Sequence, residues 1–221
     1  MFFIEHLYFL IGLYIFLILW LPLFFFNKES RKWMVRMSIL GAMLGLPFVQ
    51  KMYMADWWHP NFIFNSFIKI EDILFGFGLV GAISSIYSLL KSKDEKLLQN
   101  KFSLSQKIYI TIIAFTFFLG LFYIFKIHSF WATVIGSSLG AVIIAIKKPS
   151  FLKYAFLTGI FILITILPVY LLAIYLSPEF IRNEWFLNQL SGITFLSIPI
   201  EEFVFYIFAA LGMSAFQELF E

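Results

Sequence analysis

The chain has 221 residues, of which 62% are hydrophobic and only 13% are charged, and it contains no cysteine. Ordinary globular domains are about 45–50% apolar and about 25% charged, so a soluble domain of this length could not bury so much apolar surface. The composition predicts an all-α, polytopic membrane protein, and the lack of cysteine excludes disulfides and thiolate chemistry. The net charge is +3, and the Lys and Arg residues that produce it lie mostly in alternate loops. This distribution indicates membrane topology and not a nucleic-acid surface.

The apolar stretches of the chain predict seven transmembrane helices. A helix needs about 20 apolar residues to cross the hydrocarbon core of a bilayer. The N-terminal stretch has neither a basic segment nor a small-residue cleavage site before it, so we interpret it as a retained span. Only the tight turn Lys126-Ile127-His128 separates the fourth span from the fifth. The expected spans are roughly 7–26, 37–54, 64–90, 108–125, 129–146, 154–176 and 193–216.

Positive charge is concentrated on one side of these spans. The four Lys and Arg residues on the other side are Lys51, Lys69, Lys126 and Arg182. Because cytoplasmic loops carry the excess of Lys and Arg, we expect an outer N-terminus and a cytoplasmic C-terminus in the plasma membrane. The basic side holds Lys28, Arg31, Lys32, Arg36, Lys91, Lys93, Lys96, Lys101, Lys107, Lys147, Lys148 and Lys153.

The first three spans resemble the last three in layout. Each set has a span, a basic loop, a span with Leu-Pro (Leu46-Pro47 and Leu167-Pro168), an outer loop with tryptophan, and a span with two acids. The unmatched fourth span would make the two units parallel, a known repeat geometry in membrane proteins. We therefore expect a three-helix unit at 1–91, a basic loop and linking helix at 92–127, and a second unit at 128–221.

The last span of each unit carries two adjacent acids in the pattern I-x-I-E-[DE]-x-x-F, namely Glu71-Asp72 and Glu201-Glu202. A charged side chain at membrane depth costs about 2.5–3.5 kcal/mol, so such residues usually have a function. The expected helix starts would place Glu71 and Glu201 about 14 Å into the membrane. We expect these two to face a catalytic site and to donate protons, with Asp72 and Glu202 as tuning or relay groups. The simpler alternative is that all four only hold the bundle together.

Several aromatic residues lie near the acids in the sequence. Taken singly, they are typical of the interfacial belt or of lipid-facing surface. Together they could line an apolar slot in which ring faces stabilise a developing carbocation. The candidates are Trp58, Trp185, Phe75, Phe205 and Tyr206.

Two other patterns have ordinary explanations. Residues 76–81 match G-x-G-x-x-G but lie within a span with no preceding strand, so a dinucleotide site is not expected. Small residues that let helices pack closely explain them better, as they do Gly41/Gly45 and Gly136/Gly140. His6, His59 and His128 lack the close spacing of metal ligands, and no metal site or cofactor is expected.

Residues 198–203 read I-P-I-E-E-F, which resembles the P-x-E-[ED] signature of the small membrane lycopene cyclases. The resemblance extends over the aromatic first span, Asn27-Lys28 with Trp33, Asp56-Trp57 and both acid motifs. In that family the two units are separate subunits or are fused through an extra span, which matches the fourth span here. The first unit departs from the signature because Lys69 stands where proline is expected.

The resemblance implies a lycopene cyclase that isomerises an apolar polyene within the lipid bilayer, with no cofactor and no nucleic acid. A buried acid would protonate the terminal double bond, and ring closure with proton loss would give a β-ionone end. Glu201 would be the leading donor and Glu71 a second acid or base, while Pro199 and the aromatic candidates would contact the substrate. Lys69 could pair with Asp72 or Glu71 and weaken them as proton donors. The oligomeric state is not indicated.

Three alternatives share these features. Another isoprenoid-modifying enzyme of the same family would keep the acids but use a different substrate. A proton-coupled transporter also has intramembrane acids and repeats, but its usual mark is a helix broken at the membrane midplane. In a non-catalytic membrane scaffold, or in a partner subunit of a carotenoid pathway, the acids would only pack. Proton flux in liposomes would identify the transporter, and pigment conversion would identify the enzymes.

Overall fold

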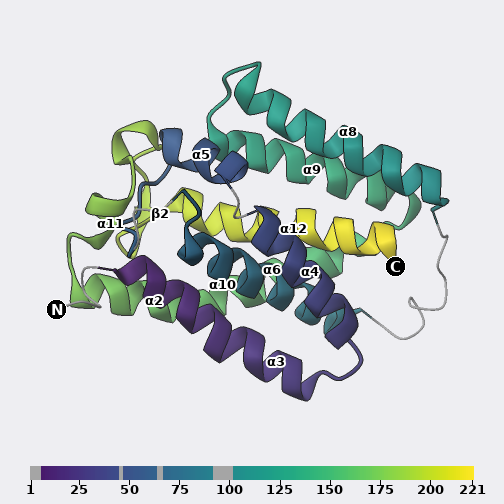
Figure 1. Ribbon diagram of the computed structural model, residues 1–221, viewed down its shortest axis with the longest axis horizontal. Coiled ribbons are helices and arrows are strands. Elements are labelled where there is room, and N and C mark those ends of the chain that lie inside the picture. The colour runs from purple at the N-terminus through teal and green to yellow at the C-terminus, as the bar shows by residue number, and fades with distance from the viewer. Residues whose placement is uncertain (1–5, 45–46, 64–66, 92–101) are drawn as a thin grey trace.

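The computed structural model describes residues 6–44, 47–63, 67–91 and 102–221. These residues form an all-α bundle of long helices with one short β-hairpin (Figure 1). The elements are α2 (Leu7–Tyr14), π-helix η1 (Ile15–Trp20), α3 (Leu21–Phe26), α4 (Arg31–Leu44), α5 (Pro47–Asp56), α6 (Ile70–Leu90), α8 (Leu104–Tyr123), α9 (Ser129–Lys147), α10 (Phe151–Leu176), α11 (Phe180–Glu184), 3₁₀-helix η2 (Leu187–Gln189), β1 (Thr194–Phe195), β2 (Ile198–Pro199) and α12 (Ile200–Phe220).

The predicted helical membrane fold is confirmed. Six helical stretches of the described chain are long and apolar enough to cross a bilayer. The first runs without a break through α2, η1 and α3 (Leu7–Phe26). A seventh span results if α4 and α5, which bend by 56° relative to each other, count as one. Lys93, Lys96, Lys101, Gly45 and Leu46, used in the sequence interpretation, lie outside the described residues.

The predicted starts of the two acid-bearing helices are wrong. Expected at 64 and 193, these helices begin at Ile70 and Ile200. Before α12 the chain forms the hairpin β1–β2, whose turn residues Leu196 and Ser197 both have positive φ. Two central residues with positive φ define the type I′ turn that suits a tight hairpin. The acids therefore lie in the first helical turn and not about 14 Å further along the helix.

Helix α6 packs at the centre of the bundle, against α4 on one side and α10 and α12 on others. Gly41 of α4 and Gly76 of α6 meet backbone to backbone, and a Cβ atom on either would overlap the carbonyl oxygen of the other. Gly81 lies equally tightly against Ser38 and Trp20. These contacts confirm that the small residues at 76–81 serve helix packing.

Helix α8, the linking span, lies at the edge of the bundle beside α9 (Figure 1). Leu121 is its one fully buried residue, whereas most of its apolar side chains are exposed. A helix with so much apolar surface outside the protein core requires lipid around it. Its inner face is nevertheless important, because it forms a wall of the cavity described below.

Charged side chains join the helices at the end of the bundle where α12 ends. Glu218 accepts hydrogen bonds from Lys91 at 2.9 Å, Lys148 at 2.6 Å and Tyr87 at 2.6 Å. Lys91 also pairs with Glu221 at 2.6 Å. Buried charges are tolerated when paired in this way. This cluster ties the last helix to α6 and α9 at the end opposite the acid pairs (Figure 1).

Candidate active site at the N-terminal ends of two helices

Both acid pairs occupy the first turn of their helices and are buried. Glu71, Asp72, Glu201 and Glu202 are all less than 8% exposed. The preceding residues, Lys69 and Pro199, have extended backbone conformations that end the incoming loops. Acidic groups are stabilised at helix N-termini by the unpaired backbone amides and the helix dipole. This location explains how four carboxyls can be buried so close together.

The first acid of each pair holds the loop that precedes its helix. Glu71 accepts a hydrogen bond from the backbone amide of Ile63 at 2.6 Å, and Glu201 accepts one from Ser191 at 2.7 Å. The two contacts are equivalent in the two units. A buried amide left without a partner costs free energy, so these carboxyls stabilise the loops.

The second acid of each pair is hydrogen-bonded to aromatic side chains. Asp72 accepts a hydrogen bond from the hydroxyl of Tyr8 at 2.7 Å. Glu202 accepts one from the Trp185 indole at 2.7 Å and one from the Tyr170 hydroxyl at 2.8 Å. The Tyr170 hydroxyl also lies 3.1 Å from that of Tyr206.

The two loops that carry Trp58 and Trp185 pair with each other and bring the acid pairs together. Trp58 and Trp185 form an antiparallel β-bridge, and their ring centroids lie 6.3 Å apart. The backbone amide of His59 donates to Glu184, and that of Phe186 donates to Trp57. The edge of Trp58 also packs on Tyr8 with centroids 4.7 Å apart. A continuous set of aromatic rings therefore connects the surroundings of Asp72 with those of Glu202.

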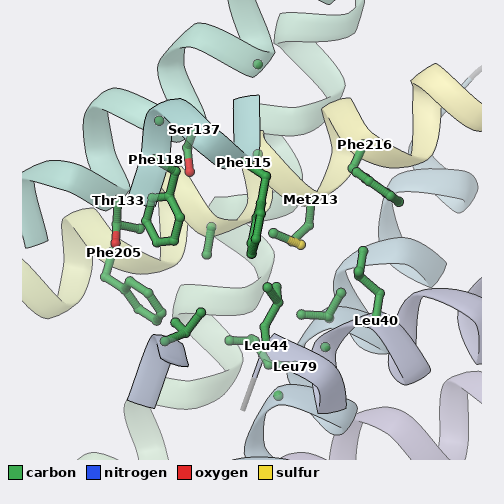
Figure 2. A pocket seen from close by; sticks show the side chains of 18 of the residues that line it. Leu40, Leu44, Leu79, Phe115, Phe118, Thr133, Ser137, Phe205, Met213 and Phe216 are labelled. Atoms are coloured by element: carbon green, nitrogen blue, oxygen red, sulfur yellow. The ribbon is translucent and has the colours of Figure 1, made fainter. Parts of the chain in front are cut away.

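A large apolar cavity begins at these two acids. Its volume is about 360 Å³, and it is bordered by residues of α4, α5, α6, α8, α9 and α12. Figure 2 shows Phe115 and Phe118 of α8 pointing into it opposite Leu44 and Leu79, with Met213 of α12 between them. Along α12 its lining runs from Glu202 to Leu219, a rise of about 26 Å at 1.5 Å per residue.

The structure divides the predicted site residues into two groups. Those on the cavity are Asp72, Glu202, Trp58, Phe75 and Phe205. Those that do not line it are Glu71, Glu201, Pro199, Trp185 and Tyr206. The orientation expected for the acids is thus reversed, because the first acid of each pair turns back to its loop.

No group of three or more metal-ligating side chains gathers in the described part of the chain. His6 and His128 bond to backbone oxygens of Asn61 and Asp56, and His59 packs on the ring of Phe186. The polar groups on the cavity that can exchange a proton at ordinary pH are the two carboxyls.

Comparison with known proteins supports a specific class of enzyme. The family model described as lycopene cyclase matches residues 128–220, which span α9 to α12 and include Glu201 and Glu202. The carboxyl-terminal part of this chain is therefore similar to the lycopene cyclase family. No curated protein matches the chain, and no solved structure does. The domain indicates a carotenoid cyclase in general terms and an integral membrane enzyme with a carotenoid substrate.

Three residues of the cyclase site escaped the sequence interpretation. Tyr8 and Tyr170 bind Asp72 and Glu202, and Phe115 closes the cavity from the linking helix. A tyrosine hydroxyl inside an apolar span is a usable signal, because a buried hydroxyl needs a partner. No comparable signal exists for Phe115 among the 31 phenylalanines of the chain.

Proposed function

We propose that the protein is a carotene cyclase that closes a ring at the end of lycopene or a closely related polyene by proton transfer alone. The observation that carries the proposal is the apolar cavity with a carboxyl from each three-helix unit at its outer end. The lycopene cyclase family match to the second unit supports the same reaction class.

The shape and lining of the cavity suit an extended hydrocarbon. It follows α12 for about 26 Å from Glu202 to Leu219, and its walls are mainly leucine, phenylalanine, glycine and alanine. Apolar pockets with a few placed polar groups are typical of small-molecule sites. A polyene lying along the helices would place one terminal end group beside Asp72 and Glu202.

The reaction needs one proton donor, one proton acceptor and a cation-stabilising wall. A proton added to the terminal double bond creates a tertiary cation, which the neighbouring double bond attacks to close a six-membered ring. Loss of a proton then restores neutrality, so the net change is an isomerisation. Trp58, Phe75 and Phe205 border the cavity next to the acids, and their ring faces can stabilise the cation.

The acids divide into reacting and positioning groups. Asp72 and Glu202 border the cavity and are placed to exchange protons with the polyene. Glu71 and Glu201 are positioning residues, since their carboxyls hold the loops before α6 and α12. This assignment replaces the leading role that the motif alone gave Glu201.

The topology is part of the proposal. Residues 1–91 and 128–221 would be two parallel cyclase-like units, with 92–127 as the basic loop and linking helix. The bridge between Trp58 and Trp185, at matching places in the two outer loops, supports this division. The distribution of Lys and Arg supports an outer N-terminus and a cytoplasmic C-terminus in the plasma membrane.

The test is expression in cells that accumulate lycopene, followed by pigment analysis. We expect the wild type to form cyclic carotenes, and Asp72→Asn or Glu202→Gln to lower β-ring formation by about 100-fold or more. Glu179→Gln, an exposed outer-loop change, is the matched control and should leave conversion intact. Unchanged lycopene in cells with wild-type protein in their membranes would contradict the proposal.

A further inference from the structure

The two carboxyls on the cavity have unequal hydrogen-bond partners. Both oxygens of Glu202 accept hydrogen bonds, one from Trp185 and one from Tyr170. Asp72 accepts a hydrogen bond from Tyr8 on Oδ1, whereas its buried Oδ2 has no partner among the residues that the structure describes. The two groups are buried to a similar extent, at 7% and 5% exposed. Their difference therefore lies in the donors around them.

The surroundings of Glu202 favour a carboxylate. An indole N–H can only donate, so Trp185 always presents a proton to Oε1. Hydrogen bonds to both oxygens offset much of the cost of burying the charge. The Trp57 indole also lies close to this carboxyl, and its N–H has no other partner in the described chain. Glu202 therefore has more hydrogen-bond donors than Asp72, which makes it the better placed of the two to carry the charge and to receive a proton.

The surroundings of Asp72 favour the neutral acid. One hydrogen bond leaves half of the carboxyl unsolvated, and a proton on Oδ2 removes the charge that would otherwise be buried there. Two neighbours act in the opposite direction and favour the charged form, namely the side-chain amide of Gln50 on the cavity wall and the ammonium group of Lys69. The Lys69 ammonium group, however, lies over the ring of Phe62 at 4.7 Å.

We propose that Asp72 donates the proton that starts cyclisation and that Glu202 removes the proton that ends it. This division of roles rests on the proposed cyclase function. The Asp72 O–H bond breaks as a C–H bond forms at C2 of the polyene, which leaves a cation at C1. The electrons of the C5=C6 double bond then form the C1–C6 bond, and the cation moves to C5. Glu202 takes the proton from C6, and the electrons of that C–H bond re-form C5=C6.

One proton enters the substrate and one leaves, so no oxidant or other co-reactant is needed. After each turnover, however, Asp72 is a carboxylate and Glu202 is an acid. A row of tyrosine hydroxyls lies between the two acids. The Tyr170 hydroxyl donates to Glu202 and lies 3.1 Å from the Tyr206 hydroxyl, and the Tyr8 hydroxyl donates to Asp72. Tyr206 and Tyr8 are near enough to interact electrostatically, without a direct hydrogen bond in the described structure. We infer that these hydroxyls return the proton from Glu202 to Asp72.

The position of the base decides which ring forms, and this separates the two roles experimentally. The C5 cation can lose a proton from C6, from C4 or from its methyl group, which gives the β, ε or γ ring respectively. Purified Asp72→Asn and Glu202→Gln are compared with wild type on lycopene in D₂O. Quenching of tryptophan fluorescence by lycopene confirms that both variants are folded and bind.

Asp72→Asn should form no cyclic product of any kind, with a loss of about 100-fold or more. Glu202→Gln should still protonate the substrate, so its remaining cyclic products carry deuterium at C2 but shift from β to ε or γ rings. Residual cyclisation by Asp72→Asn together with none by Glu202→Gln would overturn the assignment. An equal loss of cyclic product in both variants, with the ring type unchanged, would also overturn it. Failure of the wild type to convert lycopene would instead refute the proposed function.

The tyrosine return path has its own test. Tyr206→Phe should leave a single turnover unchanged when enzyme exceeds substrate, and should slow steady-state turnover at least about tenfold. Tyr175→Phe, at an exposed position of α10, is the matched control and should change neither rate. Equal slowing of the single and steady-state turnovers by Tyr206→Phe, or slowing of neither, would overturn the return path.

Discussion

At the residue scale, each acid pair divides its two side chains between a loop and the cavity. Adjacent residues on a helix point about 100° apart, so two neighbouring carboxyls cannot share one target. Glu71 and Glu201 accept hydrogen bonds from backbone amides of the loops that lead into their helices. Asp72 and Glu202 turn towards the bundle, where tyrosine and tryptophan donors meet them. The loops thereby fix the geometry in which the second acids meet the cavity.

Lys69 gives a prediction about the first unit. Its positive charge acts on Asp72 and opposes the neutral form needed for proton donation. Lys69→Met should therefore maintain or raise the rate of cyclisation, measured as the initial rate of lycopene consumption in membranes. Lys51→Met removes another outer lysine, which lies over the ring of Phe67, and should have no effect. A collapse of activity in Lys69→Met alone would show that the lysine assists the reaction.

Glu184 gives a prediction about pH. It accepts a hydrogen bond from the amide of Asn61 at 2.7 Å, and burial raises its pKa from 4.5 to about 7. Between these values the folded state binds more protons than the unfolded state, so stability falls as the pH rises. We expect the unfolding temperature to drop as the pH rises from about 4.5 to about 7, the interval between those two pKa values. Glu184→Gln should weaken this dependence, and an identical pH profile would contradict the prediction.

At the scale of elements, the helices of the first unit approach more closely than side chains would permit. Gly41 and Gly76 place the backbones of α4 and α6 in direct contact, and both glycines also border the cavity. Close backbone approach through small residues is a common way of packing membrane helices. The crossing therefore fixes the position of α6, and with it the position of Asp72.

Gly76→Ala tests the crossing. The added methyl group would overlap the Gly41 carbonyl oxygen, and such overpacking typically costs about 1–3 kcal/mol. Gly120→Ala on α8 is the matched control, because a Cβ atom there meets one side-chain atom at 3.9 Å. We expect a lower unfolding temperature for Gly76→Ala and an equal or higher one for Gly120→Ala. Equal stability of the two variants would show that the helices separate freely.

At the scale of the whole molecule, α6 and α12 contribute one carboxyl each to a single cavity. The chain Asp72–Tyr8–Trp58–Trp185–Glu202 connects these two helices through direct contacts. The opposite end of the bundle is joined by the cluster around Glu218. In the proposed reaction, one polyene end would therefore react at a time, and a molecule with two ends would have to leave and bind again in reverse.

This arrangement predicts release of a product with one ring. In a time course with limiting enzyme, the monocyclic carotene should accumulate before any bicyclic product, and added monocyclic carotene should be converted further. Pigment separation at early times measures both. Bicyclic product that appears first, with no monocyclic species, would show that both ends react in one binding event.

Much of the fold could be predicted from the sequence because it depends on composition. The length of apolar runs identifies the spans, and the glycine spacing identifies the helix contacts. Helix starts were less predictable, since residues 193–199 are as apolar as a span but form a hairpin. The positive φ of Leu196 and Ser197 has no sequence signal, because glycine or asparagine is usual there.

The sequence by itself determined that this protein lies in a membrane, that it carries two acid pairs, and that its last three spans resemble a lycopene cyclase. These properties follow from residue types and their spacing along the chain. Tertiary structure alone decided which acid of each pair borders the cavity, because the other acid accepts a hydrogen bond from a backbone amide of the preceding loop. It also decided that α8 borders a cavity lined by both acid-bearing helices. Such contacts join residues far apart in the chain, and no local pattern encodes them.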